Sequence, residues 1–234
     1  MYEFCKKNIE GFNEVKYYKT IDSAIRDGRK KNNKLIVVKY IPVTFKEMSY
    51  IDNLDIDSNE KKVILSLFVK KKIAYEINKI QKGDKAKLSV YFNGTKRTLN
   101  EIFRISNIST KCKINDIIYS LVKKNIIESV IKGDIILSFI YDIYDFIESN
   151  GKKNIIYDIK QEDIFHKIKD FTNIGNVYDY YKRDNRIIKC ARCGVLIRRK
   201  ISQKRIKYCR NCAKKVLGTQ KYEWKKRNKA KNKQ

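Results

Sequence analysis

At 234 residues the chain is long enough for one large domain or two small ones, and its hydrophobic fraction of 42% supplies at least one core. Its 54 Lys and Arg residues against 26 Asp and Glu residues give a formal net charge of +28, which calls for a polyanionic partner. No apolar run approaches the roughly 20 residues that span a bilayer, and the first residues lack the apolar core of a signal peptide, so we expect neither a membrane-spanning nor a secreted protein.

Residues 1–57 predict a small α/β lead-in in which we find no recognisable chemistry. A short helix is predicted over residues 22–31, because Asp22 is a favoured N-cap residue. Residues 35–41 are rich in Val and Ile and predict a strand that ends at Pro42, the single proline of the chain. We expect this segment to pack against the rest of the chain or to form a dimer, so a homodimer is compatible with the sequence.

Two capping-box patterns mark the starts of the next helices. Thr44 and Glu47 have the required spacing and predict a helix that runs through Leu54. Asp57 and Glu60 repeat the spacing, and the apolar residues that follow them recur at helical intervals. We expect this second helix to extend to about residue 80.

A strand, two helices and a hairpin are predicted to follow. Residues 88–92 alternate in the manner of a strand, and Thr98 and Glu101 form a capping box that opens a short helix. Residues 113–125 predict a second helix with a buried apolar stripe. Two β-rich runs, residues 126–131 and 134–140, lie on either side of a turn at Gly133 and predict a hairpin.

This order of elements resembles the winged helix-turn-helix superfamily of DNA-binding domains, and the resemblance covers about residues 60–140. Residues 121–128 are similar to the family's passage from recognition helix into wing, with Asn125 where the family often has glycine. The resemblance implies that the helix at residues 113–124 lies in the major groove of DNA. A role in docking protein partners stays open, because winged helices also serve that purpose.

The resemblance also implies a set of DNA-contacting side chains on this helix and at the tip of the wing. The candidates are Lys113, Asn115, Asp116, Tyr119, Ser120, Lys123 and Lys132. Because the wing is short, with Lys132 alone at its tip, we expect limited reading of the minor groove. The helix is only modestly basic, which keeps the protein-docking role open.

The segment before the cysteines offers no recognisable catalytic motif. Residues 154–159 predict a strand, and residues 162–171 predict a short helix that contains His166, the only histidine of the chain. We expect this histidine to have a surface or packing role. Four acidic residues could suggest a metal-dependent nuclease, but no pair of them forms an acid motif and we expect them on solvated faces. They are Asp142, Asp145, Asp158 and Asp163.

The most specific pattern in the sequence is a pair of Cys-x-x-Cys motifs near its end. Cys190 and Cys193 form the first motif, and Cys209 and Cys212 form the second after fifteen intervening residues. Two such motifs at this distance predict four thiolate ligands around one zinc ion, with Gly194 allowing the turn that aims the first pair. A site with four sulfur ligands has no open position, so we expect the zinc to be structural.

The residues around the two motifs predict a small finger. Residues 195–197 and 206–208 are expected to form the two strands of a hairpin, and a helix is expected to carry the second motif and run through Leu217. These features resemble treble-clef and zinc-ribbon fingers over about residues 188–217. Gly218 could interrupt the helix, and we expect the tail beyond it to be disordered or weakly helical in isolation.

Basic residues concentrate on this finger and its tail. Residues 182–234 contain 21 Lys and Arg residues and two acidic residues, a net charge of +19, whereas residues 1–181 have a net charge of +9. A localised patch of this kind predicts a nucleic-acid partner, because cations on the protein release the counterions of the phosphates. The candidate contacts are Arg192, Arg198, Arg199, Lys200, Lys204, Arg205, Lys207, Lys225, Lys226 and Arg227.

The sequence therefore predicts an α+β protein that combines a winged-helix domain with a four-cysteine zinc finger. The predicted segments are an α/β lead-in (1–57), a winged-helix-like domain (58–145), a connecting segment (146–186), the zinc finger (187–217) and a basic tail (218–234).

The predicted function is that of a zinc-containing nucleic-acid-binding protein, a transcription regulator or replication accessory factor, with DNA favoured over RNA. An RNA-binding or ribosome-associated factor is the alternative. A nuclease built on the finger is disfavoured, because residues 187–234 contain no histidine. We expect no enzymatic activity, no membrane association and a cytoplasmic location.

Overall fold

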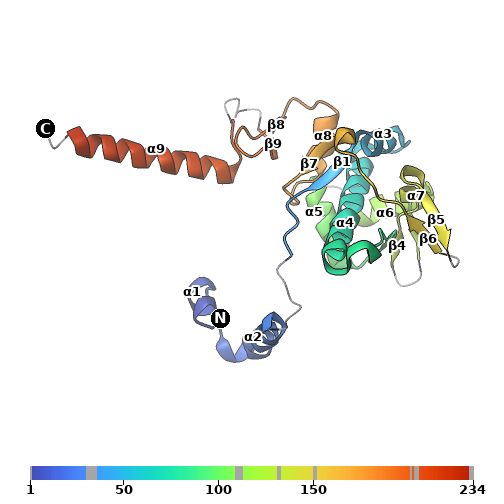
Figure 1. The fold of residues 1–234 in the computed structure, drawn as a ribbon, viewed down its shortest axis with the longest axis horizontal. Coiled ribbons are helices and arrows are strands. Elements are labelled where there is room, and N and C mark those ends of the chain that lie inside the picture. The colour runs from blue at the N-terminus through green and yellow to red at the C-terminus, as the bar shows by residue number, and fades with distance from the viewer. Residues whose placement is uncertain are drawn as a thin grey trace. The chain divides into compact units, whose positions relative to one another are not determined.

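The computed structural model contains two compact units, Met1–Val37 and Val38–Gln234 (Figure 1). The structure describes residues 2–29, 36–108, 113–130, 133–149, 152–200, 202 and 206–231. The larger unit holds every described strand and the cysteine motifs.

The smaller unit consists of two helices in its described part, α1 (Tyr2–Asn8) and α2 (Glu14–Arg29). The helix predicted to start at Asp22 begins earlier than expected. The cause is Asn13, whose side-chain Oδ1 accepts a hydrogen bond of 3.0 Å from the backbone N–H of Lys16 and so caps the helix.

The larger unit begins with β1 (Ile41–Thr44), which pairs antiparallel with β7 (Ile164–Ile168). The strand predicted over residues 35–41 is therefore displaced toward the C-terminus. Ile41 and Val43 are fully buried, and their alternation fixes which residues form the strand. Proline is tolerated between them, because a two-stranded sheet leaves half of its N–H groups without a ladder partner.

The helix predicted over residues 162–171 is wrong, because this stretch contains β7. The register of the pair places His166 opposite Val43 and Ile168 opposite Ile41. The pairing partner lies more than a hundred residues earlier in the chain, so no local pattern announces this strand.

The first predicted capping box is confirmed at the start of α3 (Phe45–Asn53). The hydroxyl of Thr44 accepts from the backbone N–H of Glu47 at 3.2 Å, and the carboxylate of Glu47 accepts from the N–H of Thr44 at 2.9 Å. Two otherwise unsatisfied donors at the helix terminus are paired in this way.

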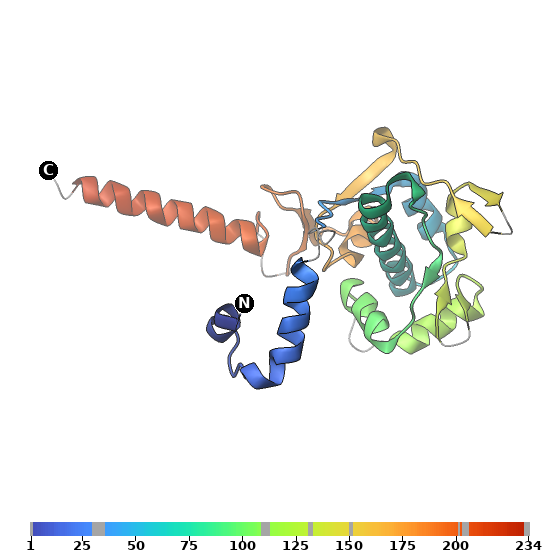
Figure 2. The same ribbon diagram turned by 60° about the horizontal axis from the view of Figure 1, so that its bottom comes forward.

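The second capping box, formed by Asp57 and Glu60, is confirmed at the start of α4 (Ser58–Lys82). This long helix stands in the middle of the larger unit, with other elements on several sides (Figure 2). Residues 63–69 of this helix are buried all round, because each of their side chains is inaccessible to solvent. The fully buried apolar residues are Val63, Ile64, Leu65, Leu67, Phe68 and Val69.

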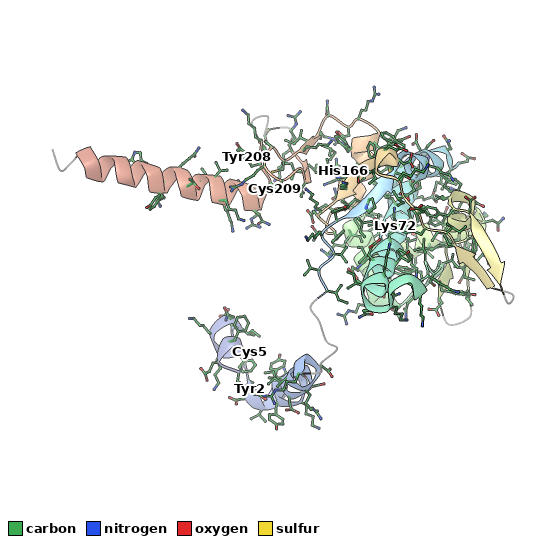
Figure 3. The ribbon with its side chains drawn as sticks, viewed as in Figure 1. Tyr2, Cys5, Lys72, His166, Tyr208 and Cys209 are labelled. Atoms are coloured by element: carbon green, nitrogen blue, oxygen red, sulfur yellow. The ribbon has the colours of Figure 1, made fainter. Side chains whose placement is uncertain are left out.

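A buried ion pair ties α4 to β1 and α3, and its lysine, Lys72, is labelled on α4 in Figure 3. Nζ of Lys72 lies 2.8 and 2.9 Å from the two carboxylate oxygens of Glu47, and it also donates to the backbone carbonyl of Pro42. The hydroxyl of Tyr144 donates to the same carboxylate. Both charges are fully buried, and these added hydrogen bonds satisfy the groups that burial removes from water.

A three-stranded sheet follows α4, with the order β2 (Tyr91–Phe92), β4 (Ile135–Ile136) and β3 (Glu128–Ser129). All pairs are antiparallel, and the hairpin predicted around Gly133 is confirmed with shorter strands. Gly94 approaches this hairpin so closely that a Cβ atom on it would lie 1.8 Å from the carbonyl oxygen of Gly133. Only glycine fits at position 94 without moving the backbone.

Two helices lie between β2 and β3 in the chain, α5 (Lys96–Ile105) and α6 (Ile114–Lys123). The predicted start of α5 is Thr98, but Thr95 is the N-cap and its hydroxyl accepts from the N–H of Thr98. The predicted helix at residues 113–125 is confirmed as α6.

The chain then forms α7 (Phe139–Ile143) and a hairpin of β5 (Phe146–Ser149) with β6 (Lys152–Ile155). The start of α7 cuts short the strand expected to reach residue 140. The strand predicted at residues 154–159 begins and ends earlier, as β6. Two 3₁₀ turns complete the described elements, at Gly83–Lys85 and Gln161–Asp163.

The last part of the larger unit contains α8 (Gly175–Tyr181), β8 (Ile187–Lys189), β9 (Leu196–Arg198) and α9 (Arg210–Lys231). A Cβ atom on Gly175 would lie 1.8 Å from the carbonyl oxygen of Ser106, so α8 packs directly on the end of α5. The tail expected to be disordered or weakly helical continues as α9, through Gly218 and up to Lys231.

Candidate metal centre

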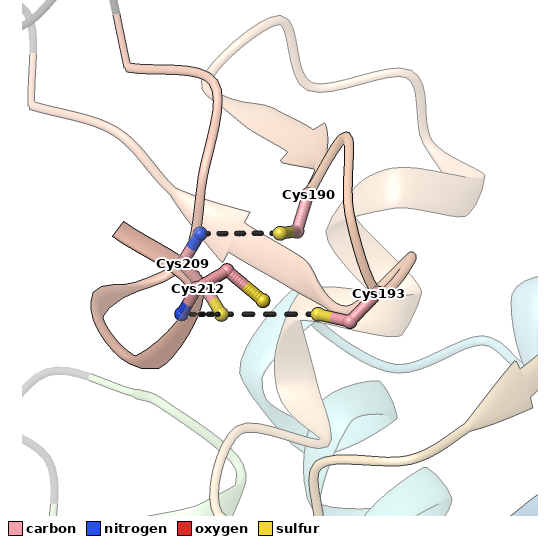
Figure 4. A group of neighbouring side chains, drawn as sticks. All are labelled: Cys190, Cys193, Cys209 and Cys212. Atoms are coloured by element: carbon pink, nitrogen blue, oxygen red, sulfur yellow. Dashed lines mark hydrogen bonds between the residues drawn. The ribbon is translucent and has the colours of Figure 1, made fainter. Parts of the chain in front are cut away.

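The four cysteines of the two Cys-x-x-Cys motifs lie together in the structure (Figure 4). Cys190 and Cys193 belong to the turn between β8 and β9, and Cys209 and Cys212 lie at the start of α9. Their Sγ atoms are all within 4.8 Å of one another, and those of Cys193 and Cys209 are 3.8 Å apart. The predicted ligand set is therefore confirmed as a spatial cluster.

The turn that carries the first motif depends on Gly194. Its φ of 74° lies in the left-handed region, as expected from the sequence. Its N–H donates to the carbonyl of Cys190 at 2.9 Å, and the N–H of Cys190 donates to the carbonyl of Val195 at 2.8 Å. These bonds fold the backbone tightly enough to bring both sulfurs of the motif to the same side.

Backbone N–H groups point at the sulfurs from the start of α9. The N–H of Cys209 donates to Sγ of Cys190 at 3.3 Å, and the N–H of Cys212 donates to Sγ of Cys209 at 3.5 Å. Donors of this kind stabilise the charged thiolate, as helix N-termini generally do.

The cluster has the electrostatics of a cation site. Burial by itself would raise the pKa of Cys190, but N–H donors, above all that of Cys209, lower it to about 6. Burial and the neighbouring thiols raise the pKa of Cys212 to about 12. Thiols this close cannot all ionise unless a positive charge lies among them.

The geometry fits a tetrahedral zinc ion. A zinc–sulfur bond of about 2.3 Å sets neighbouring sulfurs about 3.8 Å apart, which matches the separation of Cys193 and Cys209. The four residues can therefore bind one metal ion, compatible with one structural zinc. Four thiolates would complete its coordination and leave no position for a substrate.

The strands of the finger pair differently from the prediction. β9 pairs with β8, which precedes the first motif, in the register Ile188 to Ile197. Residues 206–208, expected to be the return strand, form no strand; the carbonyl of Lys207 accepts instead from the N–H of Ala191 at 2.9 Å. The first motif thus sits at the tip of the β8–β9 hairpin.

Two of the predicted phosphate contacts are engaged within the protein. Arg198 on β9 forms an ion pair with Asp179 on α8, and the other carboxylate oxygen of Asp179 lies 2.7 Å from Nζ of Lys62 on α4. The guanidinium of Arg199 donates to the carbonyl of Asn185 at 2.9 Å. No sequence pattern singles out Asp179, because its two partners are far apart in the chain.

The remaining basic candidates of the finger and tail differ in what the structure describes of them. Arg192, Lys200 and Lys207 have exposed side chains. Lys204 and Arg205 lie outside the described residues. Lys225, Lys226 and Arg227 lie on α9, and only their backbone is described.

The helix α6 presents most of its predicted contact residues to solvent. Lys113, Asn115 and Lys123 are exposed, as is Asp116, and Tyr119 has 71% of its surface accessible. Ser120, by contrast, is half-buried. Its hydroxyl hydrogen-bonds to the carboxylate of Glu60 on α4 and is therefore less accessible to a partner. The predicted wing residue Lys132 lies outside the described residues.

The acidic residues and the histidine do not form a second metal site. In the part of the chain that the structure describes, the four cysteines are the only such group of His, Cys, Asp or Glu placed to hold an ion. Asp142 accepts a hydrogen bond of 2.7 Å from the hydroxyl of Tyr50. His166 is half-buried beside Tyr180, and burial, followed by the charge of Lys189, lowers its pKa to about 4.

Comparisons with known protein families, with curated proteins and with solved structures found no match to this chain. The class that the structure itself defines is a mixed α/β protein with small sheets and a C-terminal cluster of four cysteines able to hold one metal ion. Among the described helices, none has the length and apolar composition needed to cross a membrane.

Proposed function

We propose that this chain is a zinc-containing nucleic-acid-binding protein, with DNA as its preferred partner, that acts as a transcription regulator or replication accessory factor. The observation that carries the proposal is the exposed polar face of α6, a helix otherwise anchored by the buried residues Ile117 and Leu121. The role is one of binding, with no catalytic step assigned to any residue.

The arrangement around α6 supports a winged-helix interpretation. The chain order is α4, β2, α5, α6, β3 and β4, and β4 lies between β2 and β3 in the sheet. In that superfamily, the helix in the position of α6 enters the major groove and its N-terminal half lies nearest the bases. Asn115 and Tyr119 would then face base edges, and Lys123 would face the backbone.

The end of α6 is built to turn sharply into the wing. Asn125 has a φ of 56°, its N–H donates to the carbonyl of Val122, and the N–H of Ile126 donates to that of Leu121. This pairing is a Schellman motif, and Asn tolerates its left-handed position. Asn125 thus serves where the family often has glycine.

The finger would add affinity without sequence reading. Arg192, Lys200 and Lys207 are exposed in a segment whose net charge is +19 over residues 182–234. Cations near phosphates gain from counterion release, whatever the base sequence. The metal would fix the direction of these side chains and take no part in chemistry.

The proposal is tested by measuring the affinity of the full chain for duplex DNA and structured RNA across a range of salt concentrations. We expect a preference for duplex DNA, and a log–log salt slope of about 0.9 for each phosphate contact. Tyr119→Ala should weaken specific binding by about 1–3 kcal/mol, and Lys123→Ala should lower the salt slope by about one.

Lys19→Ala is the matched control, since Lys19 is an exposed lysine on α2 in the smaller unit. It should leave both quantities unchanged. A flat salt profile, or equal affinity for all duplex sequences, contradicts sequence-directed DNA binding. A stronger affinity for RNA than for duplex DNA supports the RNA-binding alternative instead.

A further inference from the structure

A cavity of about 430 Å³ opens on the larger unit, where the end of α8 meets β7 and the start of α3. Four aromatic side chains line it: Phe45, Phe165, Tyr180 and Tyr181. Arg183 and Asn185 form a polar wall beside them. A volume in this range is typical of sites that enclose a small ligand or one group of a larger one.

The aromatic rings surround Phe165 without closing over it. The ring of Phe45 meets it edge to face at 5.3 Å between centroids, that of Tyr181 meets it at 5.4 Å, and that of Tyr180 lies 5.9 Å away. Phe45 nevertheless keeps 56% of its surface accessible. A large aromatic side chain at an open rim offers an unoccupied face for stacking.

Arg183 occupies a backbone position that ordinarily favours glycine or asparagine. Its φ is 59°, its N–H donates to the carbonyl of Tyr180, and the N–H of Asp184 donates to that of Asp179. These are the two bonds of a Schellman motif that ends α8. An arginine in the left-handed conformation is strained, and strained backbone of this kind clusters at functional sites.

Among the described residues, the other two non-glycine residues with positive φ are asparagines. They are Asn107, after α5, and Asn125, after α6, and both carry the side chain that tolerates this conformation best. Within the described chain, Arg183 is the only arginine or lysine with a positive φ at a helix end, and that helix end borders the aromatic cavity. The exposed side chain of Arg183 is available to a ligand at the rim.

The charges on the α8 side of the cavity favour an anion, whereas a neighbouring hollow that shares Phe45 is lined by Asp145, Asp158, Glu162 and Asp163. Nζ of Lys189 lies 5.0 Å from the centroid of the Tyr180 ring. The carboxylate in the wall, that of Asp184, is paired with Arg186 at 2.8 Å and with Arg198 at 3.4 Å. Its negative charge is therefore offset by the protein, whereas Arg183 is an exposed cation in the same wall.

We propose that this cavity binds one unpaired base of a single-stranded nucleic acid, with Arg183 on the adjoining phosphate. Bases stack on aromatic side chains whatever their identity, and a guanidinium matches the geometry of a phosphate. The amide of Asn185, which also lines the cavity, would then hydrogen-bond the edge of the base. This inference rests on the proposed nucleic-acid-binding function and adds a site for single strands to it.

The first test uses the full chain and short oligonucleotides, deoxy and ribo, that carry one fluorescent 2-aminopurine. Stacking in the cavity should quench the fluorescence on binding. Phe45→Ala should remove the quenching and weaken single-strand binding on the order of tenfold, as loss of one stacking platform does. Phe45→Trp should preserve both. Phe4→Ala, which removes another exposed phenylalanine in the smaller unit, should change neither.

The second test separates binding from folding. Arg183→Asn relieves the strained backbone, so the melting temperature should rise or stay the same, while single-strand affinity falls several-fold. A variant that was merely misfolded would show a lower melting temperature together with the lower single-strand affinity.

Duplex DNA affinity of the same variants distinguishes failure of this inference from failure of the proposed function. Unchanged single-strand affinity and quenching in Phe45→Ala and Arg183→Asn, with duplex binding intact, overturn the inference and leave the proposed function standing. Absence of any binding of single strands or duplexes by the unmodified chain overturns both. Equal losses of duplex and single-strand affinity also overturn the inference, because the cavity would not be selective for unpaired bases.

Discussion

The core around α4 and the cysteine finger are stabilised by different forces. Around α4, a continuous stretch of apolar side chains is fully buried, and the hydrophobic effect accounts for its stability. In the described part of residues 187–217, the buried apolar side chains apart from the cysteines are Ile187 and Leu196. So small a core cannot fold alone, and we expect the finger to depend on a bound metal ion and on its attachment to the larger core.

The attachment includes the burial of Ile187 and Leu196 in the core and a carboxylate that joins three elements. Asp179 on α8 accepts from Lys62 on α4 through one oxygen and from Arg198 on β9 through the other. All three elements are thereby joined at a single nearly buried side chain. The two regions differ in their source of stability but share this link, so variants in each region separate the two contributions to stability.

Breaking the metal centre should have the largest effect. Cys209→Ser removes one of four ligands, and structural zinc contributes about 10–16 kcal/mol of binding free energy to isolated fingers. We expect the variant to lose its zinc and to become protease-sensitive across residues 187–217, while the core around α4 stays folded. Zinc content per chain, limited proteolysis and far-UV circular dichroism measure these outcomes, with one zinc per chain expected in the unmodified protein.

Cys5→Ser is the matched control for that variant, because Cys5 lies on α1 in the smaller unit and outside the cluster. It should retain the full zinc content. If Cys209→Ser unfolds both regions together, the finger and the core are a single cooperative unit, and the contrast between them is wrong.

Removing the link between the regions should have an intermediate effect. Asp179→Asn leaves Lys62 and Arg198 without this counter-charge in a site where the Lys62 and Asp179 side chains are 11% and 10% exposed. We expect a loss of about 2–4 kcal/mol in the free energy of unfolding, measured by urea denaturation.

A comparable ion pair on α4 that does not reach the finger provides the control. Glu101→Gln breaks the more exposed pair with Lys70 and should cost less than about 1 kcal/mol. Equal effects of the two variants would show that Asp179 is an ordinary surface partner rather than a link.

The smallest effect concerns pH and His166, which lies on β7 near Lys189 of the finger. Its pKa is lowered to about 4, first by burial, so the unfolded chain binds more protons than the folded one between pH 4 and about 6.5. The contribution of neutral His166 to the free energy of unfolding is therefore fully present above this window. It is lost as the pH drops through the window, and the loss is about 1–2 kcal/mol after allowance for partial exposure.

His166→Gln removes this contribution, and no other histidine can replace it. Urea denaturation of both proteins between pH 7 and pH 4 isolates the difference, because acid effects on the metal ligands are common to both. Parallel stability curves for the two proteins would mean that His166 is solvated in the folded state.

The features that sequence analysis predicts correctly are those in which a local pattern and its physical cause lie within a few residues. Two of the three predicted capping boxes, at Thr44 and Asp57, are confirmed because each needs only a hydroxyl or carboxylate and a glutamate at fixed spacing. The third, at Thr98, is wrong, because Thr95 caps that helix three residues earlier. The cysteine cluster is confirmed because the chemistry of two Cys-x-x-Cys motifs demands that they meet.

The features that it misses depend on partners distant in the chain. The local pattern of residues 162–171 predicts a helix, although they contain β7. The strand is missed because the pairing that stabilises it is with β1, which lies far upstream in the chain. Residues 206–208 have the pattern of a return strand after the loop, whereas β9 pairs with β8 ahead of it. The aromatic cavity has the same origin, since Phe45 and Phe165 are brought together only by the β1–β7 pairing.

That pairing also constrains when the larger unit can fold as the chain emerges from the ribosome. β1 and β7 are separated by more than a hundred residues, so closing this sheet has a large loop-closure cost and is expected to be slow. Until Ile168 has been synthesised, Ile41 and Val43 have no strand opposite them, and they form an apolar edge open to other chains. The segment between them must therefore be completed before this edge is protected.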